Sequence, residues 1–183
     1  DVRSAVELLW QSASVMARFE RTGPLTRATA RTIGLVGPAA RACGLARDVR
    51  QDFASGAYNR HALTALTCDS GDVLARAQVR WREIQQSIAS IQTNLAALPD
   101  GPGSVPLGAP AADTLVVTLC EGWRGEICHV VLTDARGRCA RYKVVDPSFH
   151  NWFGLALAMR GQQISDFPLC NKSFNLSYCG HDL

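Results

Sequence analysis

Long apolar stretches are missing from this sequence, since no run approaches the roughly 20 residues that a helix needs to cross a bilayer. The first residues also lack a basic and then apolar segment with a small-residue cleavage site, so they indicate no signal peptide. The net charge of +3 is low and the arginines are dispersed, which does not favour a nucleic-acid-binding protein. The chain opens on Asp1 and not on methionine, and we expect it to be an excised part of a longer protein.

The seven cysteines lack the spacing of a metal site. No two of them form the C-x-x-C pair that is typical of zinc and iron–sulfur sites, so we expect no closed metal site in the chain. Their wide spacing does not favour a disulfide framework in a chain of this size. We expect a reducing, intracellular setting in which they serve as small apolar side chains. They are Cys43, Cys68, Cys120, Cys128, Cys139, Cys170 and Cys179.

The composition is that of a folded protein. Apolar residues make up 47% of the 183 positions and charged residues 19%, which is typical of a globular protein and not of a disordered chain. This length suffices for a substantial core, so residues 1–183 are predicted to form a single domain.

Helical periodicity dominates the first hundred residues. Apolar side chains at steps of three and four predict a helix over residues 2–20, a shorter one over 27–33 and a long one that starts after Asp69 and Ser70 and ends at Pro99. The long helix has one apolar stripe, which favours packing inside a domain over a coiled coil. The stripe consists of Leu74, Ala77, Trp81, Ile84, Ile88, Ile91, Leu95 and Leu98.

The period changes to two after a loop at 100–112 that is rich in glycine, proline and alanine. Three strands, at 114–121, 126–133 and 137–145, are separated by short turns, which predicts an antiparallel meander. A helix at about 148–160 follows, with Asp146 or Ser148 as its cap, and residues 162–183 show little period. The predicted fold class is α+β, predominantly helical, with one long central helix and a small three-stranded sheet.

Four blocks of the sequence resemble, in the same order, blocks of one protein family. They are GLVGPAARACGLARDVR, GDVLARAQVRWREI with LPDGP beyond it, WRGEICH with DARGRCARYKVVDPSFHNW, and DFPLCNKSFNLSYCGHDL. The family joins the large subunits of nickel–iron hydrogenases to the 49-kDa subunit of respiratory complex I. Within it, the chain is most similar to the energy-converting, formate-hydrogenlyase-like branch. The likeness covers nearly the whole chain from about Glu20 and corresponds to the C-terminal half of such a subunit.

This resemblance implies long helices around a buried redox cavity, with a small sheet packed to one side. It implies an electron-transfer subunit of a membrane-associated oxidoreductase that resembles NADH-quinone oxidoreductase. Its partners would be a small subunit carrying iron–sulfur clusters and a membrane arm, and the chain itself would bind no cofactor. Quinone would bind in the full complex. The chain would lie on the cytoplasmic side, held peripherally at the inner membrane by its partners and without a transmembrane segment of its own.

The tail is where the family's second pair of nickel ligands is expected. The hydrogenase pattern there resembles S-F-D-P-C-x-x-C, and this chain places Ser177 and Gly180 at the two cysteine positions. A serine hydroxyl is hard and normally protonated, and glycine has no side chain, so neither replaces a thiolate. Cys179 is one position out of register. The resemblance therefore implies no metal at the former nickel–iron site.

The block around residues 41–50 supplies further candidates, because in the family it lies near the redox cavity. Arg41, Cys43, Arg47, Asp48 and Arg50 are, with Ser177 and Cys179, our cavity-lining candidates, and the charged ones can form a buried ionic network or a proton path. A solvated run of charge is the plainer interpretation of this block. No catalytic residue is assigned.

Other residues allow two interpretations. His129 is either an ordinary strand histidine or a polar group that faces the cavity, and Arg124-Gly125-Glu126 is either a tight turn or an ion pair that faces the cavity or a partner. Cys179, His181 and Asp182 imitate a thiol–histidine–acid set, but residues this close in sequence rarely align as one.

Two other functions are compatible with the sequence. One is a true nickel–iron hydrogenase that uses unusual ligands. The other is a non-catalytic scaffold that docks an iron–sulfur subunit. The isolated chain is expected to be inactive under each of them, because half of the cavity is absent.

Overall fold

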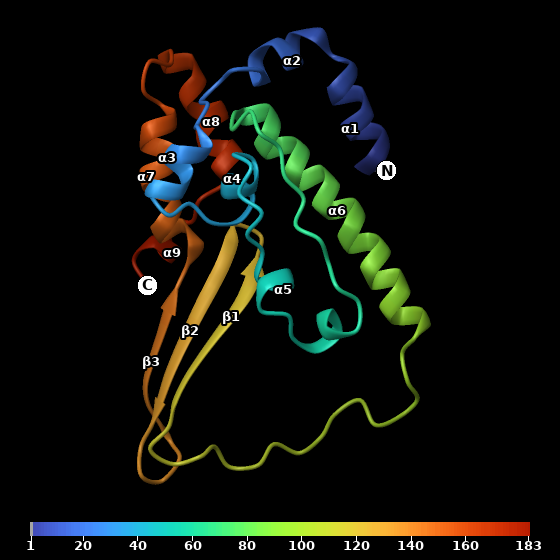
Figure 1. Cartoon of the computed structure of the whole chain (residues 1–183), viewed down its shortest axis with the longest axis vertical. Coiled ribbons are helices and arrows are strands. Elements are labelled where there is room, and N and C mark those ends of the chain that lie inside the picture. Colours follow the sequence, from blue (N-terminus) through green and yellow to red (C-terminus); the bar gives the residue numbers. More distant parts are fainter. Residues whose placement is uncertain (1) are drawn as a thin grey trace.

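The computed structural model describes residues 2–183, which form a group of helices with a three-stranded sheet extending from one end (Figure 1). The α-helices before the sheet are α1 Val2–Gln11, α2 Ala13–Phe19, α3 Arg27–Thr32, α4 Gly37–Arg41, α5 Val49–Asp52 and α6 Val73–Ala96, and the 3-10 helix η1 covers Gly56–Asn59. The strands are β1 Leu115–Gly122, β2 Gly125–Thr133 and β3 Cys139–Val145. After them come α7 Pro147–Ala158, the 3-10 helix η2 Ile164–Asp166, α8 Phe167–Phe174 and α9 Tyr178–His181.

The sheet is the predicted antiparallel meander, with strand order β1-β2-β3. At the hairpin, Glu121 lies opposite Glu126 and Gly122 opposite Gly125. The hairpin end of the sheet meets the helices, and the opposite end projects away from them (Figure 1). Together with α6, this arrangement confirms the predicted α+β fold with one long helix.

The helix that the sequence predicts over residues 2–20 is divided into two. Ser12 has an extended backbone with φ −80° and ψ 104°, so α1 ends before it and α2 begins after it. Serine competes with the helix by favouring cap conformations, which is the physical reason that apolar periodicity alone missed the break.

The tail is more regular than its sequence indicates. Residues 162–183 show little period in the sequence, yet η2, α8 and α9 occupy most of this segment. Gln163 and Asp166 form a capping box, and Pro168 lies in the first turn of α8, where its fixed φ favours the helix. Asn175 then ends α8 in the left-handed conformation at φ 55°.

The long helix α6 begins later than predicted. Asp72, and not Asp69 or Ser70, caps it by accepting a 2.8 Å hydrogen bond from the Ala75 N–H. The other carboxylate oxygen of Asp72 accepts from the Arg21 N–H at 2.9 Å. One side chain therefore caps α6 and fixes the turn after α2.

The buried face of α6 is not its apolar stripe. The buried residues of α6 all lie in its first two turns. They are Val73, Ala75, Arg76 and Val79. Farther along, the apolar stripe is exposed to solvent: Ile88 is 52% exposed, Ile91 58%, Leu95 64% and Leu98 72%. The expectation that the stripe packs inside the domain is therefore wrong for this half of the helix, which α1 to α9 leave uncovered.

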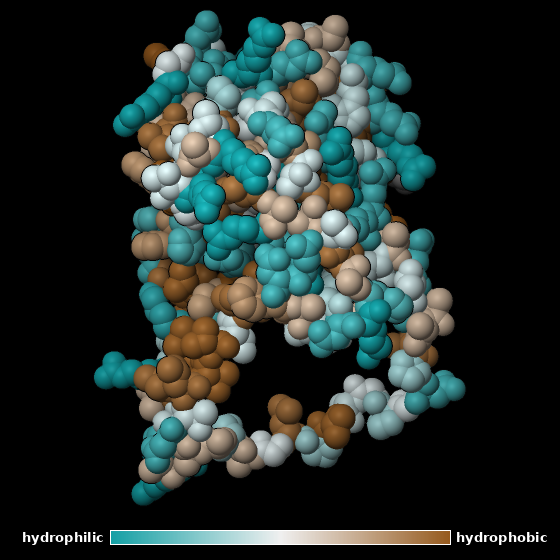
Figure 2. Space-filling model, viewed as in Figure 1, coloured by the Kyte–Doolittle hydropathy of each residue, from teal (hydrophilic) through white to brown (hydrophobic). Residues whose placement is uncertain are grey.

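The core lies where α3, α4, α7 and α8 meet the start of α6. Its fully buried members include Leu35, Ala40, Cys43, Val73 and Phe174. The loop from α6 to β1 runs outside this core and is exposed throughout residues 98–113. In Figure 2 this loop stands away from the body, so it contributes little to the packing.

A glycine contact joins the hairpin to the helices. Gly37 opens α4 at φ +64°, and a Cβ on it would lie 2.3 Å from the Arg124 carbonyl oxygen. Asn151 of α7, which is buried, accepts from the Val36 N–H at 3.1 Å and donates to the Arg124 carbonyl at 3.4 Å. The β1–β2 turn and α4 thus meet backbone to backbone, the Asn151 side chain joins α7 to both, and this fixes where the end of β1 lies.

Candidate functional site

Five charged side chains from four elements form a buried ionic cluster near this junction. They are Arg41 at the end of α4, Asp48 and Arg50 at the start of α5, Glu83 of α6 and Glu121 of β1. The side chains of Arg41, Asp48 and Glu121 are only 1%, 3% and 4% exposed. Charges are rarely buried this far unless they are paired, so each of these groups needs a partner inside the cluster.

Arg41 is the centre of the cluster. Its Nε donates to Glu83 at 2.6 Å, and one Nη donates both to Glu121 at 2.8 Å and to the Arg47 carbonyl at 2.8 Å. The same Nη lies 3.3 Å from Asp48. One guanidinium therefore bridges three carboxylates that belong to three different elements.

Asp48 and Arg50 form a second, local pair. Arg50 donates through Nε and Nη2 to the two oxygens of Asp48 at 2.9 and 2.6 Å, which is the bidentate geometry of strong charge-assisted bonds. Asp48 also caps α5, because its carboxylate accepts from the Arg50 N–H at 3.0 Å. Capping and ion pairing thus fix the same carboxylate.

Burial and pairing move the pKa values of this cluster in opposite directions. Burial acts to raise the pKa of Asp48, but the hydrogen bonds and positive charges of Arg50 and Arg41 outweigh it and hold that pKa below its ordinary value. At Glu121 burial prevails, so its pKa is raised although Arg41 lies beside it. The two acids therefore differ in their readiness to take up a proton.

Two clefts adjoin the cluster. One, of about 340 Å³, lies between α6 and the end of β1 and is lined by Arg50, Glu83 and Glu121 together with Ile84, Ser87, Ile88, Ile91, Gly122 and Trp123. The other, of about 100 Å³, lies between α5, η1 and β1 and includes Arg50, Tyr58 and Glu121. Arg50 and Glu121 line both, so charged groups of the cluster meet open space on two sides.

The structure brings together three of the predicted site residues and separates the others. Arg41, Asp48 and Arg50 share the cluster. Arg47 contributes its carbonyl to it, while its side chain is 56% exposed and reaches Glu126 at 3.9 Å. Cys43 lies in the hydrophobic core, where its thiol donates to the Ala39 carbonyl at 3.4 Å and burial raises its pKa to about 11.

Sequence reasoning missed Glu83 and Glu121. Glu83 follows Arg76 and Arg80 at steps of four and three, which places the three on one face of α6. This polar stripe could have indicated Glu83 as a site residue, but the sequence was interpreted from the apolar stripe of the same helix. Glu121 lies near the end of a largely apolar strand. No local pattern indicates that it pairs with Arg41, which lies 80 positions earlier.

Arg76 and Arg80 hold the tail against α6. The buried Arg76 donates to the Ser173 hydroxyl at 2.8 Å and lies over the Phe174 ring at 4.4 Å. Arg80 donates to the Ser173 and Phe174 carbonyls at 2.6 and 3.1 Å, satisfying two carbonyls at the end of α8. Burial lowers the pKa of each arginine to about 10.

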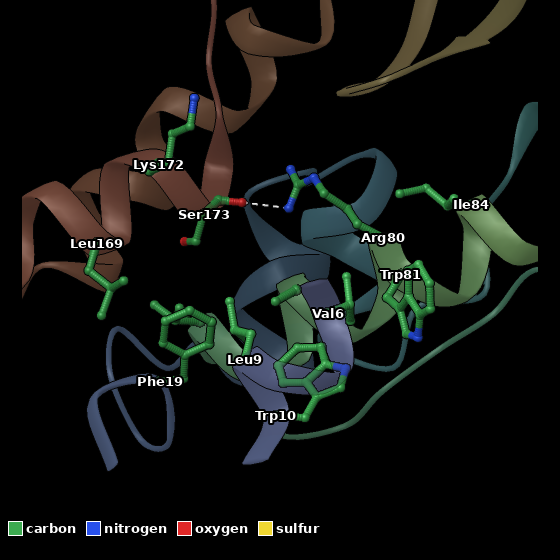
Figure 3. A pocket seen from close by; sticks show the side chains of 12 residues that line it. Val6, Leu9, Trp10, Phe19, Arg80, Trp81, Ile84, Leu169, Lys172 and Ser173 are labelled. Atoms are coloured by element: carbon green, nitrogen blue, oxygen red, sulfur yellow. Dashed lines mark hydrogen bonds between the residues drawn. The ribbon is translucent and has the colours of Figure 1, made fainter. Parts of the chain in front are cut away.

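An apolar pocket of about 320 Å³ adjoins these arginines, between α1, α2, α6 and α8 (Figure 3). Trp10, Phe19, Trp81 and Leu169 are among its lining residues. Arg80 is one of the few polar residues at its wall, and Figure 3 shows its guanidinium turned toward the Ser173 carbonyl.

At position 180 the family's cysteine would require the side chain of Asp146 to move. The Ser177 hydroxyl accepts from the Gly180 N–H at 2.9 Å and so caps α9. A Cβ on Gly180 would lie 2.5 Å from Cγ of Asp146, which in turn caps α7. The residues at these two positions therefore do not fit the ligation of nickel. Within residues 2–183, no group of three histidine, cysteine or acidic side chains is arranged to hold a metal ion.

The remaining candidates have local partners. His129 stacks on Tyr142 across the sheet, and Arg124 donates to the Asn175 carbonyl, which fixes the hairpin to the end of α8. Cys179 is exposed, and the ring of His181 packs on Phe149 at a centroid distance of 5.7 Å. These contacts are structural and do not join the thiol to the imidazole.

Thiol reactivity should divide the cysteines by burial. Cys120, Cys139 and Cys179 are exposed, so iodoacetamide should label them in the folded chain. Cys43 and Cys170 are buried with raised pKa values, and they should react at least tenfold more slowly until urea unfolds the chain. Mass spectrometry of the digested protein checks this order. Rapid native labelling of Cys43 would contradict its place in the core.

Known proteins match nearly the whole chain. A profile of the family described as respiratory-chain NADH dehydrogenase, 49 Kd subunit, matches residues 1–112 and 104–182. The carbon monoxide-induced hydrogenase of Rhodospirillum rubrum is 36% identical over 173 residues, which are 93% of this chain and 47% of that protein. A subunit of the NADH-quinone oxidoreductase of Syntrophobacter fumaroxidans is 32% identical over 81% of this chain and 41% of its own length. Formate hydrogenlyase subunit 5 of Escherichia coli (strain K12) is 28% identical over 97% of this chain and 31% of its own length.

These similarities confirm the family that the four sequence blocks indicated. The chain spans less than half the length of these curated relatives. A chain in the structure of the membrane-bound sulfane sulfur reductase, an archaeal respiratory membrane complex, matches 99% of this chain and 51% of its own length. The TM-score is 0.90 at 23% sequence identity, so the two share a fold.

Proposed function

The chain belongs to the family of the 49 kDa subunit of respiratory-chain NADH dehydrogenase, and from this premise we propose that it is an electron-transfer subunit of a membrane-associated respiratory oxidoreductase. The observation that carries this proposal is the family match over residues 1–112 and 104–182. Its relatives include subunits named for NADH-quinone oxidoreductase and for hydrogenases. The proposed complex resembles the former.

The proposed complex contains no nickel at this chain. Position 180 has no side chain, and Asp146 occupies the space that a cysteine would need. In the proposal, electrons pass through iron–sulfur clusters of a small partner subunit, and quinone is the acceptor in the complete complex. The chain itself holds no cofactor.

The exposed apolar stripe of α6 supports membership of a larger assembly. Apolar side chains that are more than half exposed along one helix are rare on monomeric proteins when they form a continuous surface. None of the helices within residues 2–183 has both the length and the apolar character for crossing a membrane. We therefore propose peripheral attachment at the cytoplasmic side of the inner membrane through partner subunits.

A double substitution on this stripe tests the assembly. Ile88→Asp with Ile91→Asp should lower the amount of complex recovered with the tagged protein at least tenfold, because two charges would be buried in the contact. Gln92→Asp is the control, since Gln92 is exposed beside the stripe but not part of it. Recovery is measured by quantitative mass spectrometry of material isolated from membranes. Equal recovery for the double variant would show that the stripe is not a subunit contact.

A nickel-containing hydrogenase is the second candidate, favoured by the 36% identity to the carbon monoxide-induced hydrogenase. Both functions are tested on the isolated complex by metal analysis and by two assays, NADH-dependent quinone reduction and hydrogen evolution. We expect iron without nickel, and quinone reduction without hydrogen evolution. Stoichiometric nickel with hydrogen evolution would establish the hydrogenase. A complex that assembles but reduces no quinone would favour a scaffold.

A further inference from the structure

We propose that Glu121 is a proton-binding site of the ionic cluster, whose carboxyl takes up one proton from water in the two clefts it lines and returns it, while Asp48 stays ionised. The site does not depend on the identity of the electron donor or acceptor. It follows from the arrangement of charges, from burial and from the clefts.

The ion pairs of the cluster are unequal. Three carboxyl groups, those of Asp48, Glu83 and Glu121, contact the two guanidinium groups of Arg41 and Arg50, and a third arginine, Arg80 of α6, acts on Glu83 at longer range. Arg50 is engaged in a bidentate pair with Asp48, which leaves Glu83 and Glu121 to share Arg41. Glu121 therefore shares its one ion-pair partner with a second acid, and protonation of Glu121 removes the repulsion between the two carboxylates.

Glu121 is the acid that takes this proton. Its side chain is 4% exposed, against 14% for Glu83, so ionisation of Glu121 costs more solvation. Its oxygens accept one bond each, from Arg41 at 2.8 Å and from the Val49 N–H at 3.1 Å, so a lone pair stays available for a proton. The raised pKa of Glu121 and the lowered pKa of Asp48 agree with this order.

Charged or titratable groups face Glu121 from each element packed against it. They are Arg41 from α4, Asp48 and Arg50 from α5, Glu83 from α6, Glu126 opposite it on β2, and Tyr58 from η1 across the smaller cleft. Three of these are acids and two are guanidiniums. The nearby acids therefore offset the cations and keep a neutral Glu121 favourable.

Access to water distinguishes this site from a purely structural buried acid. Glu121 lines both the 340 Å³ cleft beside α6 and the 100 Å³ cleft beside η1. Protonation adds one proton to a carboxylate oxygen and removes one negative charge, and no electron moves. Because Arg41 and Val49 can keep their bonds to the neutral acid, the proton can enter or leave without rearrangement of the cluster.

Labelling with N,N′-dicyclohexylcarbodiimide tests the proposal on the full chain. This apolar reagent reacts with protonated carboxyl groups: the acid O–H adds across a C=N bond, and no atom leaves. The larger cleft is lined by Ile84, Ile88, Ile91 and Trp123, which suits an apolar reagent. We expect one adduct, mapped to Glu121, which forms at least fivefold faster at about pH 6 than at about pH 8. An ordinary glutamate is ionised at both pH values and would show no such difference.

The controls separate Glu121 from its neighbours. Glu126→Gln, at the cross-strand position, should still give an adduct that maps to Glu121, while Glu121→Gln should abolish it. An adduct that maps to Glu83 alone would overturn the assignment. Infrared titration decides the case in which no adduct forms. A carboxylic-acid carbonyl band that persists to about pH 6 and is lost in Glu121→Gln supports the site, whereas its absence from the unaltered chain overturns it.

Discussion

Replacing Arg41 with methionine should destabilise the chain by about 3–5 kcal/mol, which is the usual cost of removing one partner from a buried ionic group. The substitution keeps a long side chain in a site that is 1% exposed and removes only the charge and its donors. Glu83 and Glu121 then lose their common guanidinium, and the Arg47 carbonyl loses a donor. Urea unfolding followed by circular dichroism measures the loss. Arg47→Met is the control, since the side chain of Arg47 is 56% exposed and should contribute less than about 1 kcal/mol.

The loss caused by Arg41→Met should depend on pH. Burial already raises the pKa of Glu121 in the folded state, and loss of Arg41 raises it further above that of the unfolded chain, so the contribution of this acid is retained at low pH and lost as pH increases. The difference in unfolding free energy between the variant and the natural chain should therefore be smaller at about pH 5 than at about pH 8. A difference that is constant with pH, or below about 1 kcal/mol, would contradict the central role of Arg41.

Replacing Gly37 with alanine should destabilise the chain by about 3–5 kcal/mol through steric overlap and backbone strain. The new Cβ would lie 2.3 Å from both the Arg124 carbonyl oxygen and Cα of Gly125, which are backbone atoms that cannot rotate away. The hairpin would have to move from α4, and the end of β1 with Glu121 would move with it. We therefore also expect the label at Glu121 to change.

Gly34 offers a matched control for this substitution. Its φ of +70° is close to the +64° of Gly37, but nothing lies within 4 Å of a Cβ placed on it. Gly34→Ala thus introduces the same left-handed strain without the overlap and should cost about 1–2 kcal/mol. Comparison of the two variants by urea unfolding isolates the contact between α4 and the hairpin. Equal losses would show that backbone strain alone accounts for the effect.

Much of the fold could be predicted because local patterns carry it. The strands, α3 and α7 lie close to their predicted ranges, since alternation and caps are properties of neighbouring residues. The tail helices were missed because α8 and α9 are too short for apolar periodicity, and their signals are Pro168, Asn175 and Ser177. That residues 1–183 form one domain of a longer protein stays a prediction.

The candidate site was only partly predictable. Arg41, Asp48 and Arg50 are close in sequence, so one block of the sequence indicated them together. Glu83 and Glu121 lie 42 and 80 positions from Arg41 and are added only by tertiary packing. The prediction that the apolar stripe of α6 packs inside the domain failed for a related reason. Hydrophobicity indicates that a helix face is buried, but not whether it packs against the same chain or against a partner.

The contact between Gly180 and Asp146 limits the substitutions that the tail accepts one at a time. Cysteine at position 180 alone would meet a carboxylate at 2.5 Å, and removal of Asp146 alone would uncap α7. Each single change is therefore costly before the other is made, and Ser177 would still have to become cysteine. A thiolate pair at positions 177 and 180 would therefore require at least three coordinated substitutions in this fold.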